Sequence, residues 1–293
     1  MRKQFKQTVL DLAHNDESVV VILGDVSVYL FNEFMETYPD RFYNMGICEN
    51  TLISVAAGMN SQGFNPFVHS ITPFITERSF EQIKLDLCYN GFGANIVSCG
   101  ASFDYAWDGA THHAYTDLAI LRLLPGMEVI QPGSEKELDI LTHSQYNNAK
   151  PTYFRLSDHP HNIDLPVEFG KAVIIKNKNA PLTVMTAGPI LGNVLDACRD
   201  LDINLVYFHT IKPIDKQIIN EFKDTEILVI HDAFGLYEAI CDIGGLSASY
   251  HGLPDKFCTS YGTLDNIRKK IGLDSKNIRN KVTQCLNTTK ITI

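Results

Sequence analysis

Short apolar runs alternate with segments of helical period along the chain, and this alternation constrains the fold more than any other feature. Runs such as Val19–Leu23 and Pro151–Arg155 are bounded by Gly, Pro, Asn or Asp, as buried strands are. Helical segments such as residues 2–14 and 50–61 lie between such runs. Strands joined by helices form parallel sheets that are covered on both faces. The sequence therefore predicts an α/β protein with doubly wound, mostly parallel sheets.

The alternation is interrupted once, which predicts two domains. From residue 159 to residue 181 the chain is rich in Pro, His, Asn and Lys, and the alternation then restarts. A chain of 293 residues also exceeds the usual size of a single core. We expect a first domain at residues 1–162 and a second at 163–293. The expected strands are 19–23, 42–44, 65–69, 95–99, 128–131, 151–155, 182–186, 204–209 and 227–231, and the expected helices are 2–14, 29–38, 50–61, 74–87, 117–123, 135–147, 190–201, 215–222 and one from 234.

Composition and charge disfavour several classes of protein. Lys and Arg number 25 against 34 Asp and Glu, so the net charge of −9 leaves no basic surface for nucleic acid. No apolar run approaches the roughly 18 residues that span a bilayer, and the first residues lack the apolar stretch of a signal peptide. The seven cysteines include no C-x-x-C pair, which favours reduced thiols and the cytoplasm.

Ligands of open parallel sheets bind beyond the carboxyl ends of the strands, so the segments after strands are the candidate site. Glu49 precedes a helical segment, where a structural first-turn acid is one interpretation. Phe74 is equally consistent with a core aromatic. Residues 105–113 hold the only Trp together with Asp108 and His112, and ordering such side chains without a ligand is costly. We therefore interpret this loop as functional, not merely as a structural connection. Adjacent histidines lack the spacing of a helical metal pair, so we expect this chain to form no metal site.

Taken together, these segments resemble the pyrimidine-binding and C-terminal domains of transketolase and its relatives. The resemblance implies an enzyme that transfers a two-carbon ketol unit between a ketose and an aldose, or a related aldehyde, with thiamine diphosphate as coenzyme. The matching stretches occur in the family's order and cover nearly the whole chain: residues 46–58, 72–82, 108–122, 125–132 and 209–215.

The resemblance also implies roles for single residues. Glu49 would bind the aminopyrimidine ring of the coenzyme and act in catalysis, with Phe74 stacked on that ring. Arg78 and Asp25 would line the same coenzyme site. His112 would serve as an acid/base and orienting group near the substrate.

Asp108 would join His112 in contacting the substrate, and Arg155 is a candidate for binding its phosphate, although a packed or ion-paired arginine is as consistent with the strand there. The family's phosphate-binding Arg falls on Asp158, and a carboxylate repels a dianion that an Arg clamps. A further family His falls on Gly100. We therefore expect at least one substrate that is not an ordinary sugar phosphate.

The family's diphosphate-binding domain, with its Gly-Asp-Gly element, has no counterpart in this sequence. We therefore expect a C-terminal subunit of a split enzyme. An N-terminal transketolase-like subunit would hold the diphosphate and Mg²⁺, two copies of each chain would form an α₂β₂ assembly containing a homodimer of this chain, and this chain alone would be inactive.

Three alternatives remain open, of which the first two share the two expected domains. The first is the β subunit of a keto-acid dehydrogenase, and the second is a fragment resembling deoxyxylulose-phosphate synthase. The third is an assembly subunit without catalysis, although such a subunit has little reason to keep both Glu49 and His112. Two-carbon transfer from a ketose, as opposed to decarboxylation of pyruvate, separates the enzymes.

Overall fold

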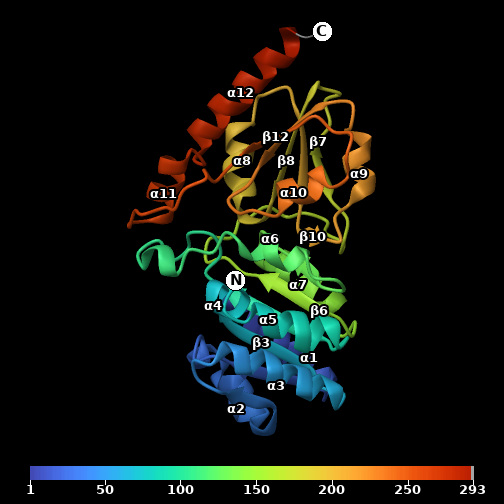
Figure 1. The fold of residues 1–293 in the computed structure, drawn as a ribbon, viewed down its shortest axis with the longest axis vertical. Helices are drawn as coiled ribbons and strands as arrows, with labels where there is room; N and C mark the ends of the chain where they lie inside the picture. The colour runs from blue at the N-terminus through green and yellow to red at the C-terminus, as the bar shows by residue number, and fades with distance from the viewer. Residues whose placement is uncertain (292–293) are drawn as a thin grey trace.

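Two mostly parallel β-sheets form the centre of the protein and follow one another along its long axis (Figure 1). This computed structural model describes residues 1–291. It confirms the predicted α/β class. The seven-stranded sheet has the order β10-β5-β6-β4-β3-β1-β2 and the five-stranded sheet the order β12-β11-β8-β9-β7. The strands are β1 Val19–Leu23, β2 Phe42–Asn44, β3 Asn65–Ile71, β4 Ala94–Cys99, β5 Glu128–Ile130, β6 Pro151–Arg155, β7 Val173–Lys176, β8 Leu182–Ala187, β9 Asn204–Phe208, β10 Thr210–Lys212, β11 Glu226–Ile230 and β12 Ala248–His251.

Helices cover both faces of the first sheet because its strands are apolar on both sides. In β1, Val21 and Leu23 pack with the helices α1 and α7, whereas Ile22 between them packs against α3 on the other face. Each fully buried aliphatic side chain contributes about 1.5–3 kcal/mol. The α-helices are α1 Arg2–Asn15, α2 Asn32–Thr37, α3 Glu49–Ser61, α4 Thr72–Thr76, α5 Phe80–Gln82, α6 Asp117–Arg122, α7 Glu135–Gln145, α8 Leu191–Ala197, α9 Lys216–Glu221, α10 Leu236–Cys241, α11 Leu264–Ile271 and α12 Ser275–Ile291.

One strand from the second half of the chain pairs with the first sheet, across the domain boundary expected at residue 162. The segment Thr210–Lys212, which is not among the predicted strands, forms β10 and pairs antiparallel with β5 of the first sheet. Polar contacts add to this connection, since Tyr207 donates to Glu137 at 2.7 Å and His231 lies 2.9 Å from the side-chain oxygen of Gln131. The second half of the chain therefore completes the first sheet.

Several predicted helices are shorter than expected, and two of them differ most. The expected helix 74–87 is divided into α4, α5 and a π-helix, Ile83–Tyr89, with Arg78 in the break. The helix expected from residue 234 ends at Cys241, soon followed by Gly244 and Gly245 in the left-handed region. Within residues 1–291, none of the helices combines the length and apolar character that crossing a bilayer demands.

Candidate active site

Glu49 is the first residue of α3 and lies at the carboxyl ends of β1 and β3. Its side chain is 1% exposed, and such burial of a carboxylate requires partners. Ser70, at the end of β3, donates a hydrogen bond to one carboxylate oxygen at 3.3 Å. Arg78 donates to the other oxygen at 2.7 Å. Glu49 is thus a buried, oriented carboxylate, and not merely an exposed acid of the first helical turn.

Arg78 binds two predicted site residues at once. Its guanidinium carbon lies 4.5 Å from the centroid of the Phe74 ring, while its nitrogen donates to Glu49. The break between α4 and α5 permits this, because Arg78 lies outside both helices and folds back over Phe74. The structure therefore brings together a carboxylate acceptor and an aromatic face, with a flat cation between them.

His112 extends this arrangement toward the loop that the sequence singled out. Its ring centroid lies 5.1 Å from that of Phe74 and 6.1 Å from that of Tyr105, both edge to face. Asp108 begins the short turn Gly109–Thr111 that leads to His112, and its side chain is exposed. His112 thus lies beside the Phe74 ring, and Asp108, which was also predicted to contact the substrate, lies on the same loop.

Asp25 lies on the loop after β1, in a strained backbone conformation. Its φ is 63° and that of Ser27 is 64°, values that non-glycine residues rarely adopt. Asn44 clamps Asp25 by accepting from its backbone N–H at 3.0 Å and donating to its carboxylate at 3.1 Å. Burial lowers the pKa of His69 to about 4, so its neutral ring donates to Val97 and accepts from Ser27. Fixed loops of this kind are typical of binding sites.

Arg155 is placed in the interior, where its side chain is 0% exposed. It donates to Asp117 at 2.8 Å, to Ser102 at 3.2 Å and to the carbonyl oxygen of Ala114 at 2.6 Å. Of the two roles that the sequence allowed for Arg155, phosphate binding or an internal ion pair, the structure shows the ion pair. Its guanidinium supports the loop that leads from Ala114 to α6.

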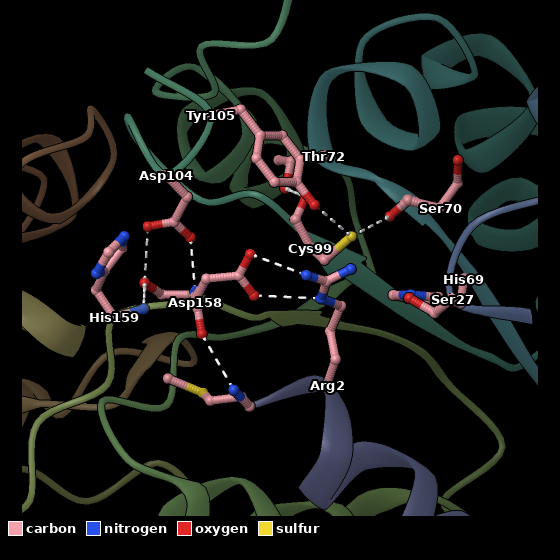
Figure 2. A network of polar contacts seen from close by, with 12 residues as sticks. Arg2, Ser27, His69, Ser70, Thr72, Cys99, Asp104, Tyr105, Asp158 and His159 are labelled. Atoms are coloured by element: carbon pink, nitrogen blue, oxygen red, sulfur yellow. Dashed lines mark hydrogen bonds and ion pairs between the residues drawn. The ribbon is translucent and has the colours of Figure 1, made fainter. Parts of the chain in front are cut away.

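Four residues near this site were not among the predicted ones: Arg2, Ser70, Asp104 and Tyr105. Figure 2 shows Arg2 facing Asp158, with Asp104 and Tyr105 on the neighbouring loop. A Ser at a strand end is a weak signal for Ser70. Arg2 carries no local signal, because its partner lies 156 positions away.

The carboxylate acceptor and the aromatic face of this site fit an aminopyrimidine ring. The guanidinium of Arg78 is flat, stacks on Phe74 and donates N–H to Glu49, and these are the contacts that a flat heterocycle with N–H donors would need. Residues 1–291 contain no cluster of three or more His, Cys, Asp or Glu able to hold a metal ion.

Comparison with known proteins defines the family. The transketolase pyrimidine-binding domain matches residues 1–159, more than half of the chain, so the chain belongs to the transketolase family. More particularly, it corresponds to the C-terminal section of split transketolases. The transketolase C-terminal section of Methanocaldococcus jannaschii is 30% identical, and the match covers 96% of this chain and 95% of that protein.

Two further comparisons agree with this assignment. One of the subunits of the apulose-4-phosphate transketolase of Phocaeicola vulgatus is 28% identical, with 94% of each chain covered. A solved structure described as a split gene transketolase, inactive beta4 tetramer, has a TM-score of 0.87 and 26% identity, with 98% of each chain covered. The chain spans only 48% of the 1-deoxy-D-xylulose-5-phosphate synthase 2 of Geobacter sulfurreducens, to which it is 26% identical.

Proposed function

We propose that this chain is the C-terminal subunit of a split, thiamine-diphosphate-dependent enzyme that transfers a two-carbon ketol unit from a ketose to an aldose or related aldehyde. The observation that carries the proposal is the buried carboxylate of Glu49 beside the face of Phe74, both in contact with one flat cation. Family membership supports the coenzyme, because thiamine diphosphate supplies the electron sink for breaking and forming the carbon–carbon bond.

In this proposal the residues of the chain bind and orient. Glu49 accepts a charge-assisted hydrogen bond from the protonated ring nitrogen of the pyrimidine, and Ser70 keeps the carboxylate in place. Phe74 stacks on the ring once Arg78 has moved aside, and Asp25 lines the same pocket. His112 and Asp108 face the substrate, where His112 moves protons to and from the reacting oxygen.

The partner in this proposal is an N-terminal transketolase-like chain that supplies the sites for the diphosphate and Mg²⁺. We propose an α₂β₂ assembly in the cytoplasm, with the active site between the two kinds of chain. Two relatives are named as a C-terminal section and as one subunit of a transketolase, and a third is described as an inactive tetramer. These descriptions support a need for the partner.

Reconstitution tests the proposal. The chain, a matching N-terminal subunit, thiamine diphosphate and Mg²⁺ should together transfer the ketol unit of hydroxypyruvate to an aldehyde, while either chain alone should not. Isothermal titration should show coenzyme binding only to the pair. A pair that binds no coenzyme contradicts the proposal, and a catalytically silent pair that binds it favours the assembly subunit.

Condensation of pyruvate with an aldehyde is the second candidate activity. Synthases of this type are among the relatives, with 26–27% identity over the matching half. Release of CO₂ from pyruvate in the same reconstituted pair, without ketol transfer from a ketose, would favour that activity or a dehydrogenase β subunit.

A further inference from the structure

Arg2 and Asp158 form a two-pronged ion pair at the edge of the site (Figure 2). Nε and Nη2 of Arg2 each donate to one carboxylate oxygen of Asp158 at 3.2 Å. Both side chains are 27% exposed, so the pair is accessible to a ligand. The Nε–Nη2 edge of the guanidinium, with which Arg2 could clamp an oxyanion, is thus taken by a carboxylate of the same chain.

A second carboxylate fixes Asp158 from behind. Asp104 accepts a hydrogen bond from the backbone N–H of Asp158 at 2.8 Å and another from the hydroxyl of Ser157 at 3.0 Å. These bonds anchor the backbone from which Asp158 reaches Arg2. A phosphate that displaced Asp158 from Arg2 would therefore lie beside a carboxylate that has little freedom to retreat, with Asp104 close behind.

Tyr105 connects this ion pair to the rest of the site. Its ring lies over Gly100, where an added Cβ would come within 2.4 Å of the ring. The absence of a side chain at Gly100 thus leaves the space that the Tyr105 ring occupies, and the φ of 79° at this position suits glycine. The ring faces His112 at 6.1 Å on one side, and its hydroxyl lies 3.4 Å from the thiol of Cys99. Figure 2 shows that hydroxyl turned toward the side on which Arg2 lies.

A surface hollow of about 210 Å³ opens beside the pair. The charged side chains that line it are Arg2, Lys3, Glu135 and Asp158, two of each sign. Met1 also lines this hollow, and its amino group lies 3.9 Å from the carboxylate of Glu135. Arg2 and the amino group thus each face a carboxylate of the chain itself.

We propose that Tyr105, Asp158 and Arg2 form the subsite for the far end of the substrate, and that this subsite selects an uncharged, hydroxylated end over a phosphate. This inference rests on the proposed ketol transfer. The phenol hydroxyl and the carboxylate oxygens bind sugar hydroxyls, and Asp158 holds Arg2 away from dianions. Specificity then arises from an in-chain carboxylate that penalises the phosphorylated competitor.

Acceptor competition in the reconstituted pair tests this subsite. With hydroxypyruvate as donor, we compare kcat/KM for glyceraldehyde, erythrose and ribose, each free and phosphorylated. The unmodified pair should prefer the free aldoses. Asp158→Asn frees Arg2 and should shift the ratio toward the phosphorylated aldoses by about tenfold or more. Tyr105→Phe removes one hydroxyl and should raise KM for the free aldoses more than it lowers kcat.

Three controls make the result decisive. Lys6 lies on α1, as Arg2 does, and pairs with Glu33 of α2. Glu33→Gln breaks this other ion pair and should leave the ratio of free to phosphorylated acceptors unchanged. Arg2→Gln removes the cation and should keep phosphorylated aldoses poor even when combined with Asp158→Asn. Inorganic phosphate should raise the melting temperature of Asp158→Asn and not that of the unmodified chain.

Preference of the unmodified pair for phosphorylated aldoses overturns the subsite, as does an unchanged ratio in a folded Asp158→Asn pair. A pair without coenzyme binding refutes the proposed function itself. The titration of coenzyme therefore distinguishes failure of the subsite from failure of the function.

Discussion

Glu49 and Arg78 form an ion pair whose two members have very different exposure: the carboxylate is 1% exposed and the guanidinium side chain 47%. The buried member is fixed by the fold, whereas the exposed member can leave. Arg78 also covers the face of Phe74, where the proposed function puts the pyrimidine ring. In that proposal, coenzyme binding would exchange one flat N–H donor for another at a preformed acceptor.

Replacing Glu49 by Gln should abolish ketol transfer. The amide keeps the size of the side chain but loses the charge that holds and polarises the ring nitrogen, and we expect a loss of about 100-fold or more in kcat. Size-exclusion chromatography should show an unchanged assembly with the N-terminal subunit. Unchanged rates would contradict the assigned role and favour an assembly subunit.

Replacing Arg78 by Ala should destabilise the free chain and enlarge its response to coenzyme. Glu49 then keeps only Ser70 as a partner, and an undercompensated buried carboxylate costs about 1–3 kcal/mol. The coenzyme restores a donor and no longer has to displace the guanidinium. The rise in melting temperature of the assembled pair on adding coenzyme should therefore be larger than in the unmodified pair. A smaller rise would show that Arg78 holds the coenzyme.

Replacing Asp104 by Asn should flatten part of the dependence of stability on pH. Burial, with the carboxylate of Asp158 nearby, raises the pKa of Asp104 to about 7, above its value in the unfolded chain. The folded state therefore binds more protons between about pH 4 and pH 7, and the contribution of this group to stability falls as pH rises through that range. Urea unfolding at pH 5 and pH 7.5 should show a smaller difference for Asp104→Asn. An equal difference would contradict the assignment.

Replacing Asp117 by Ala should cost about 3–5 kcal/mol of unfolding free energy, because it leaves the fully buried Arg155 without its counter-ion. Replacing both residues together, Asp117→Leu with Arg155→Met, should recover most of this loss. The double variant should keep its KM for the aldose if Arg155 is structural. A selective rise in KM for phosphorylated substrates would assign Arg155 to substrate binding instead.

The sequence by itself determined the class of fold and several members of the site. Buried strands such as Val19–Leu23 were predicted with their observed bounds, because a strand buried on both faces is a continuous apolar run. Glu49, Phe74 and His112 were predicted through a resemblance in the order of motifs, and the structure brings them together. Periodicity did not reveal β10, because this strand follows β9 after a single residue and leaves the sheet of β9 to pair with β5.

Only the tertiary structure decided how charges are matched at this site. The pairing of Arg2 with Asp158 joins positions 156 residues apart, and the place of Arg78 over Phe74 depends on a break in a helix that periodicity predicts as continuous. Local sequence sets which residues are apolar and where strands end. Which cation meets which carboxylate depends on the distances that packing creates, since the energy of a charge pair falls with separation and with exposure to water.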